Sequence, residues 1–130
     1  MRTRYARRVF AAAGFFNIVV GTSMFLAPLL TMRLLGIARP QSPLFMDMAS
    51  WLILVLGTGY CLTALNPERN RDLMLVGAIG KLLVLPLMLT AWRRGEVGLS
   101  GVVAGSADLV FALLFFDVMR RMKGPRTSTA

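Results

Sequence analysis

Long blocks of apolar residues separated by short charged strips dominate the chain. The blocks show no alternation with a period of two, which argues against β-strands. About 20 apolar residues are needed to cross a hydrocarbon core of about 30 Å as a helix. The pattern therefore predicts four membrane-spanning helices, at approximately 9–30, 46–65, 67–92 and 98–119.

These blocks predict an all-α fold, a four-transmembrane-helix bundle with up-down-up-down topology that forms one domain over residues 1–130. Pro28 falls near the outer end of the first helix, and the longest connection, 31–45, follows it. Asn66 and Pro67 form a plausible N-cap and first-turn pair for the third helix. Residues 120–130 are predicted to form a disordered basic tail.

Basic residues mark the orientation of the predicted bundle, because Lys and Arg are enriched in cytoplasmic segments. Ten of them lie in the N-terminal segment, the turn after Pro67 and the C-terminal tail, whereas four lie in the other two connections. This bias predicts a multi-pass protein of the inner (plasma) membrane with both termini cytoplasmic (N-in/C-in). The segment 9–30 is too long for the apolar region of a signal peptide, so it is interpreted as a retained helix.

The net charge of +9 belongs to these strips, where it faces lipid headgroups and sets topology. Because no basic stripe with interleaved aromatic residues is present, nucleic acid is not an expected partner. The chain has no histidine and one cysteine, Cys61, which removes the commonest ligands for haem and transition metals. No catalytic constellation is visible either, so neither a cofactor nor enzymatic activity is expected.

Three polar residues inside the predicted spans carry the main functional signal: Asn17, Lys81 and Asp108. Each lies nine residues from a charged helix end, which places all three about 13 Å above the cytoplasmic ends at the helical rise of about 1.5 Å per residue. A charge at this depth costs about 2.5–3.5 kcal/mol on insertion scales, so such residues usually face the bundle interior. We expect one intramembrane polar site that contains a Lys81–Asp108 ion pair.

Small residues accompany the polar ones and allow helix backbones to approach closely. The stripes are Gly14 and Gly21 around Asn17; Gly77 and Gly80 before Lys81; Gly101, Gly105 and Ala112 around Asp108; and Ser50, Gly57 and Ala64 on the second helix. Three interpretations of the ion pair remain open. It fixes helix register, it belongs to a midplane site for a polar or anionic ligand or a proton, or it forms between chains.

Other polar residues are interpreted as structural. Asp47 is expected at the start of the second helix, where it favours the helix dipole. Glu68 and Asp72 belong to a solvated turn, and Asp117 is spaced to pair with Arg120 and Arg121 on its own helix. Tyr60 and Cys61 are predicted to be packing residues.

The motifs Gly14-x-x-Asn17-x-x-x-Gly21 with Pro28, Asn70-Arg71-Asp72 followed by Gly80-Lys81, and Gly105-x-x-Asp108 occur in this order. In this ordering the chain resembles small bacterial four-helix integral membrane proteins of the DoxX-like type. The resemblance spans most of the chain and implies fold and location rather than an activity. The stretch Asn17-Ile-Val-Val-Gly21-Thr22 is also similar to the first-helix signature of small multidrug-resistance transporters, but Asn17 replaces their acidic residue.

Three classes of function follow from these observations. The first is an accessory or structural membrane protein that binds lipid or partner helices, with the ion pair holding the bundle. The second is a small transporter or channel subunit that uses Asn17, Lys81 and Asp108, possible as a homodimer because one four-helix unit encloses little volume. The third is a quinone-reactive membrane enzyme subunit. The first is favoured, with the lipid bilayer and a homodimer or partner membrane protein as the expected partners.

Overall fold

The computed structural model describes residues 2–123, and all regular structure in this range is α-helical. The helices are α1 (Arg2–Leu26), α2 (Pro28–Leu35), α3 (Pro43–Leu65), α4 (Arg71–Arg93) and α5 (Leu99–Met122). α1, α3, α4 and α5 are long and apolar enough to span a membrane. The four predicted spans are thus present as long helices, and α2 is an additional short helix.

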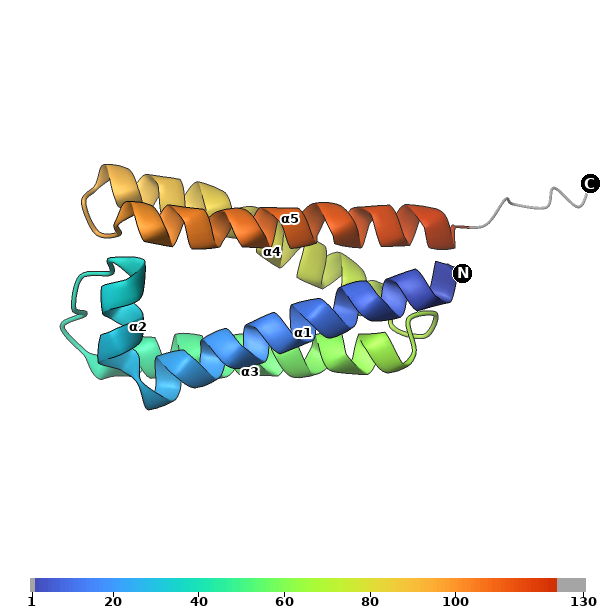
Figure 1. The fold of residues 1–130 in the computed structure, drawn as a ribbon, viewed down its shortest axis with the longest axis horizontal. Helices are drawn as coiled ribbons and strands as arrows, with labels where there is room; N and C mark the ends of the chain where they lie inside the picture. Colours follow the sequence, from blue (N-terminus) through green and yellow to red (C-terminus); the bar gives the residue numbers. More distant parts are fainter. Residues whose placement is uncertain (1, 124–130) are drawn as a thin grey trace, which may run out of the picture.

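Pro28 divides the first predicted span into two helices (Figure 1). The prediction of a helix over 9–30 is wrong at both ends, because α1 extends back to Arg2 and stops at Leu26. Proline disfavours the helical conformation in the residue before it, and Ala27 accordingly leaves the helix with φ −132° and ψ 59°. Pro28 then occupies the first turn of α2, which runs across the long helices at one end of the molecule.

Capping residues shift the other predicted boundaries. α3 begins at Pro43 rather than at 46, because the Ser42 hydroxyl accepts a hydrogen bond from the Leu44 N–H. Asp47 therefore lies in the second turn of α3 and not at its start. α5 continues past 119 to Met122, so the predicted disordered tail is wrong for 120–122, and its residues 124–130 lie outside the described range.

The interpretation of Asn66 and Pro67 as the start of the third span is also wrong. Asn66 is the C-cap of α3, and its side-chain oxygen accepts a hydrogen bond from the Arg69 N–H. The Asn70 amide donates hydrogen bonds to the carbonyl groups of Leu62 and Asn66. It therefore pairs carbonyl groups at the C-terminal end of α3 that would otherwise lack a hydrogen-bond donor. The polar turn thus closes one helix, and α4 begins only at Arg71.

Two helix pairs make up the molecule: α1 packs along α3, and α4 packs along α5. The start of α1, the turn between α3 and α4 and the end of α5 lie at one end, on the right in Figure 1. α2 and the turn between α4 and α5 lie at the opposite end. We call the first end the basic end and the second the α2 end.

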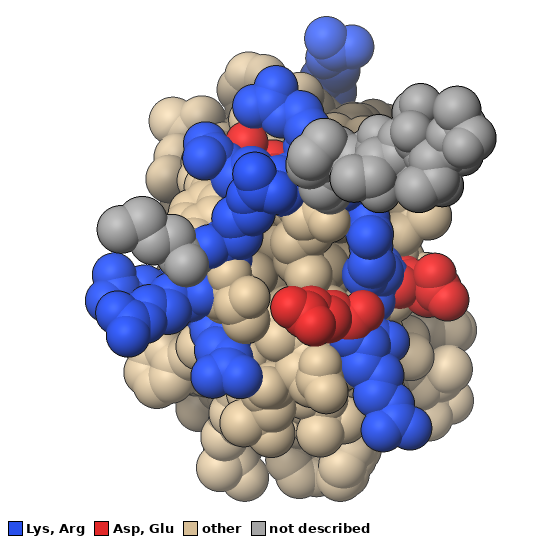
Figure 2. Space-filling view, turned by 90° about the vertical axis from the view of Figure 1, so that its right-hand side faces the viewer, with Lys and Arg blue, Asp and Glu red and all other residues tan. Residues whose placement is uncertain are grey.

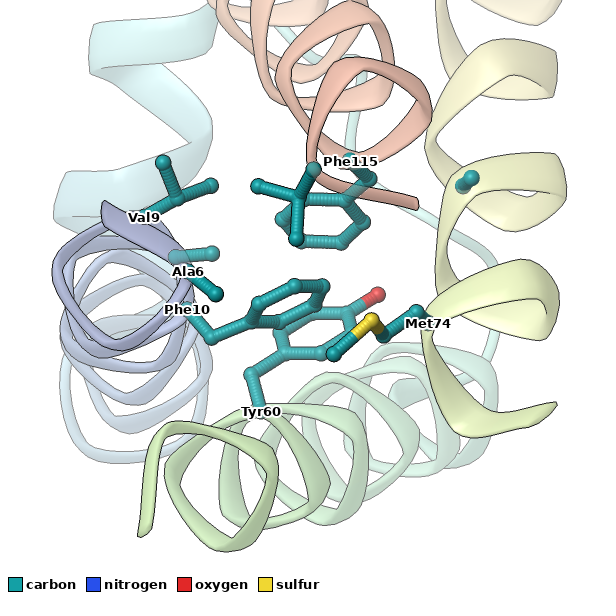
Figure 3. Packing of buried hydrophobic residues seen from close by; sticks show 9 residues of the cluster. Ala6, Val9, Phe10, Tyr60, Met74 and Phe115 are labelled. Carbon is teal, nitrogen blue, oxygen red and sulfur yellow. The ribbon is translucent and has the colours of Figure 1, made fainter. Parts of the chain in front are cut away.

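The main apolar core lies near the basic end and joins all four long helices (Figure 3). The rings of Phe10 and Phe115 stack with centroids 4.2 Å apart, and Tyr60 meets Phe115 edge-on at 5.1 Å. Met74 of α4 packs against this cluster. Tyr60 is fully buried here, as predicted for a packing residue. A smaller core of Met24, Met32 and Met46 lies around the start of α3.

Close backbone approach holds α1 against α3. A Cβ atom at Gly14 would lie 2.6 Å from Cys61 Sγ, and one at Gly21 would lie 3.1 Å from the Ser50 carbonyl oxygen. These contacts agree with the predicted stripes of small residues. Gly80 is an exception, since a Cβ there would meet no atom within 4 Å and the residue is exposed. Gly80 therefore faces outward, and the helix period assigns the inward position to Gly77 alone.

Candidate functional site

Lys81 is the centre of the polar site, and the structure brings all three predicted residues together around it. Its ammonium donates hydrogen bonds to Asn17 Oδ1 at 2.9 Å and to Asp108 Oδ1 at 2.5 Å. The second contact is the predicted salt bridge between α4 and α5. Lys81 is only 4% exposed, so the charge is almost completely removed from the surface.

Three aromatic rings surround the same ammonium. Lys81 Nζ lies 5.5 Å from the ring centroid of Phe16, 5.4 Å from that of Tyr60 and 5.1 Å from that of Phe111. A cation over the face of an aromatic ring is attracted by its quadrupole, and the gain is about 2 kcal/mol or more when the cation is desolvated. We call the ammonium, Asn17, Asp108 and these three rings the Lys81 cluster.

Small residues make room for this cluster. Gly77 precedes Lys81 by one helical turn, and a Cβ there would lie 2.5 Å from Tyr60 Cε1. The Tyr60 ring can therefore lie directly on the α4 backbone and reach the ammonium. On the other side, Gly57 of α3 lies against the Asn17 side chain, where its own Cβ would be 3.0 Å from that of Asn17.

The cluster connects all four long helices. Asn17 lies on α1, Tyr60 on α3, Lys81 on α4 and Asp108 on α5. The Asn17 amide also donates a 3.4 Å hydrogen bond to the backbone carbonyl of Ile53 on α3. Because each helix supplies at least one group, a change of register in any helix would break a polar contact.

Sequence reasoning identified the three polar residues but missed the rings. Phe16 is the neighbour of Asn17, and Phe111 follows Asp108 by three residues, which places the two on the same helix face. That spacing is a usable signal for Phe111. Tyr60 gave no such signal, because no polar partner on α3 marks its depth.

Asp108 is the most accessible of the three polar residues in the cluster. Its side chain is 18% exposed, and among the described residues only its Oδ1 atom accepts a hydrogen bond. The second oxygen, Oδ2, has no hydrogen-bond partner within residues 2–123. One edge of an otherwise enclosed site thus remains open.

The basic end holds a second polar network. Asp117 forms the expected salt bridges with Arg120 and Arg121 at 3.2 and 2.7 Å. It also accepts a 3.0 Å hydrogen bond from the Tyr5 hydroxyl, which joins the ends of α1 and α5 and was not expected from the sequence. Glu68 and Asp72 are exposed there, as predicted for a solvated turn.

Backbone contacts close the α2 end. Gly36 ends α2 with φ +63°, a conformation that glycine adopts without strain. Its carbonyl accepts a 2.8 Å hydrogen bond from the Gly98 N–H, and the Ala38 N–H donates to the Glu96 carbonyl at 3.0 Å. We call this pair of hydrogen bonds the glycine latch. It ties the connection after α2 to the turn between α4 and α5.

Within the described range, no group of three or more His, Cys, Asp or Glu side chains is arranged to hold a metal ion. No protein-family model, curated protein or solved structure matches the chain. The resemblance to DoxX-like proteins therefore still rests on the short motifs in the sequence. The following proposals rest on the chemistry and geometry of the Lys81 cluster and the two ends.

Proposed function

We propose that the chain is a multi-pass protein of the inner (plasma) membrane, with α1, α3, α4 and α5 crossing the bilayer in up-down-up-down order. The length and apolar composition of these helices support this proposal. Large apolar side chains are exposed along every one of them, as expected for a lipid-facing surface. Examples are Phe15, Val55, Leu83 and Val103.

The charge distribution supports an orientation with both termini in the cytoplasm. Lys and Arg side chains gather on several sides of the basic end, and Figure 2 shows a few Asp and Glu side chains among them. In the described part of the chain this end holds Arg2, Arg4, Arg7, Arg8, Arg69, Arg71, Arg120, Arg121 and Lys123, against Arg33, Arg39, Arg93 and Arg94 near the α2 end. The more basic end is the cytoplasmic one by the positive-inside rule.

The proposed role within the membrane is accessory or structural, with lipid or partner helices as the ligands of the outer surface. One observation carries this proposal: Lys81 is only 4% exposed, and its ammonium already contacts two polar side chains and three aromatic rings of the same chain. An external substrate would have to displace Asn17, Asp108 or an aromatic ring to reach it. The geometry of the cluster therefore favours a structural role, in which the polar contacts fix the register of the helices, over a role as a midplane transport site.

A small transporter or channel subunit is the second candidate, and the open side of Asp108 is the observation that favours it. A carboxylate oxygen without a partner, inside a membrane span, is a position where a proton or a hydrogen-bond donor can bind. This function would make Asp108, rather than Lys81, the residue that meets the substrate.

Thermal unfolding of the detergent-purified protein tests the structural role. The variants are Lys81→Met, Asp108→Leu and the double variant, with Leu83→Met as a control on an exposed face of α4. Each single variant leaves a charge without its partner, so we expect a loss of about 3–5 kcal/mol. The apolar double variant should recover most of this loss, and the control should match wild type.

If the three cluster variants were all as stable as wild type, the structural proposal would be wrong. The charges would then be retained for a ligand, and Asp108→Asn would be the first variant to examine for loss of transport.

A further inference from the structure

A pocket at the basic end takes no part in the Lys81 cluster. It has a volume of about 250 Å³ and is lined by Arg2, Thr3, Glu68, Arg71 and Met122. These residues come from the start of α1, the turn between α3 and α4, the start of α4 and the end of α5. Segments that are far apart in the sequence thus build one site next to the proposed cytoplasmic interface.

Two guanidinium groups give the pocket its main chemistry. Arg2 is exposed and Arg71 is half-buried, and neither forms a salt bridge with another described residue. By contrast, Arg120 and Arg121 at the same end are already paired with Asp117. Guanidinium groups bind phosphate through two parallel hydrogen bonds, so two that have no salt bridge within residues 2–123 favour a phosphate ligand in this pocket.

The other lining residues narrow the class of ligand. Glu68 would repel a simple anion, but its carboxylate accepts hydrogen bonds from hydroxyl groups. The Thr3 hydroxyl can donate or accept, and Met122 offers an apolar wall. A ligand that suits all of them carries a phosphate, hydroxyl groups and an apolar part.

We infer that this pocket binds the headgroup of an anionic phospholipid that carries hydroxyl groups, of the phosphatidylglycerol kind. Arg2 and Arg71 hold the phosphate, Glu68 accepts hydrogen bonds from the glycerol hydroxyls, and the acyl chains continue along the apolar helices. This inference rests on the proposed membrane location, and it gives the proposed lipid-binding role a specific lipid and a specific site.

The surrounding charge makes a matched control necessary, because basic residues near a surface attract any anionic lipid. Arg4 and Arg69 are exposed at the same end, carry the same charge and do not line the pocket. The variant pair Arg4→Gln/Arg69→Gln therefore removes the same net charge as Arg2→Gln/Arg71→Gln. A difference between the two pairs reports the pocket rather than the overall field.

The experiment titrates the detergent-purified full chain with short-chain lipids and measures affinity by native mass spectrometry and calorimetry. The probes are phosphatidylglycerol, phosphatidylmethanol, phosphatidylcholine and inorganic phosphate. Phosphatidylmethanol has the charge of phosphatidylglycerol but lacks its hydroxyl groups. Phosphatidylcholine has no net charge, and inorganic phosphate represents a soluble anion.

We expect wild type to bind phosphatidylglycerol more tightly than the other three probes. The Arg2→Gln/Arg71→Gln pair should weaken this binding by at least about tenfold, because charge-assisted hydrogen bonds are lost. The control pair should weaken it by about threefold or less at 0.15 M salt, where the Debye length is about 8 Å. Glu68→Leu should remove the preference for phosphatidylglycerol over phosphatidylmethanol, because it deletes the oxygen atoms that accept hydrogen bonds from the hydroxyl groups.

Equal effects of the two arginine pairs would overturn the inference, since binding would then follow surface charge alone. Equal affinity of wild type for phosphatidylglycerol and phosphatidylmethanol would also overturn it, as would tighter binding of inorganic phosphate. Membrane fractionation and the Lys81→Met and Asp108→Leu series are measured separately. If these behave as expected while the lipid titration fails, only the lipid site is wrong and the proposed function stands.

Discussion

At the scale of single residues, the ammonium of Lys81 depends on aromatic rings as well as on Asn17 and Asp108. We predict that Phe111→Leu lowers stability more in wild type than in the Lys81→Met/Asp108→Leu background, where no cation remains. The difference is the coupling between ring and ammonium, about 0.5–2 kcal/mol. Thermal unfolding of the four proteins in this cycle measures it.

Phe15→Leu is the matched control for this cycle, because the Phe15 ring is 71% exposed and is adjacent to Phe16 on α1. Its effect should be the same in both backgrounds. If Phe111→Leu also showed no coupling to the charge, the rings around Lys81 would serve only as apolar packing.

The polar part of the cluster was predictable because depth along a helix follows directly from residue counts. Asn17, Lys81 and Asp108 are each nine residues from a charged residue that borders the apolar block of its helix, and the structure places them in contact. The hydrogen bond from Tyr5 to Asp117 was not predictable. It depends on how the ends of α1 and α5 meet, which the pattern of either helix alone does not give.

At the scale of secondary-structure elements, a substitution at Gly36 tests how much the glycine latch contributes to stability. We predict that Gly36→Ala destabilises the protein for two reasons. A left-handed conformation costs a residue with a Cβ about 1–2 kcal/mol. The new methyl group would also lie 2.8 Å from the backbone of Gly98, so the latch would have to separate.

Gly95→Ala is a close control, since Gly95 also has a positive φ, +74°, but a Cβ there would meet nothing within 4 Å. Gly95→Ala should therefore lower stability only by the cost of the left-handed backbone conformation. Thermal unfolding gives the total effect, and amide hydrogen exchange at Ala38 and Gly98 reports the latch itself. Equal losses for Gly36→Ala and Gly95→Ala would mean that the latch contributes nothing.

The existence of the four long helices followed from the apolar blocks, but several of their boundaries did not. Pro28 was interpreted as part of the first span, whereas it begins a helix that takes a different direction. Asn66 and Pro67 have the composition of a helix start, yet the Asn70 side chain donates hydrogen bonds to carbonyl groups at the end of the preceding helix. Local composition shows that a boundary is near, and the hydrogen-bond partners decide which helix it belongs to.

At the scale of the whole molecule, the distribution of charge predicts which end faces the cytoplasm. In a Cys61→Ala background, we expect Arg39→Cys to react with a membrane-impermeant maleimide in intact cells. Arg69→Cys lies at the basic end and should react only after the membrane is permeabilised. The reverse labelling pattern would invert the proposed topology, and reaction of both in intact cells would contradict a sealed four-span arrangement.

The participation of all four long helices in one polar cluster also has a consequence for biosynthesis. The chain is made from its N-terminus, so of the two polar partners of Lys81, Asn17 is synthesised 64 residues before it and Asp108 27 residues after it. Asn17 is therefore the first side chain that can accept a hydrogen bond from the ammonium. We therefore expect that an amide, rather than a carboxylate, is the first polar partner available to this charge if α4 enters the proposed bilayer before α5.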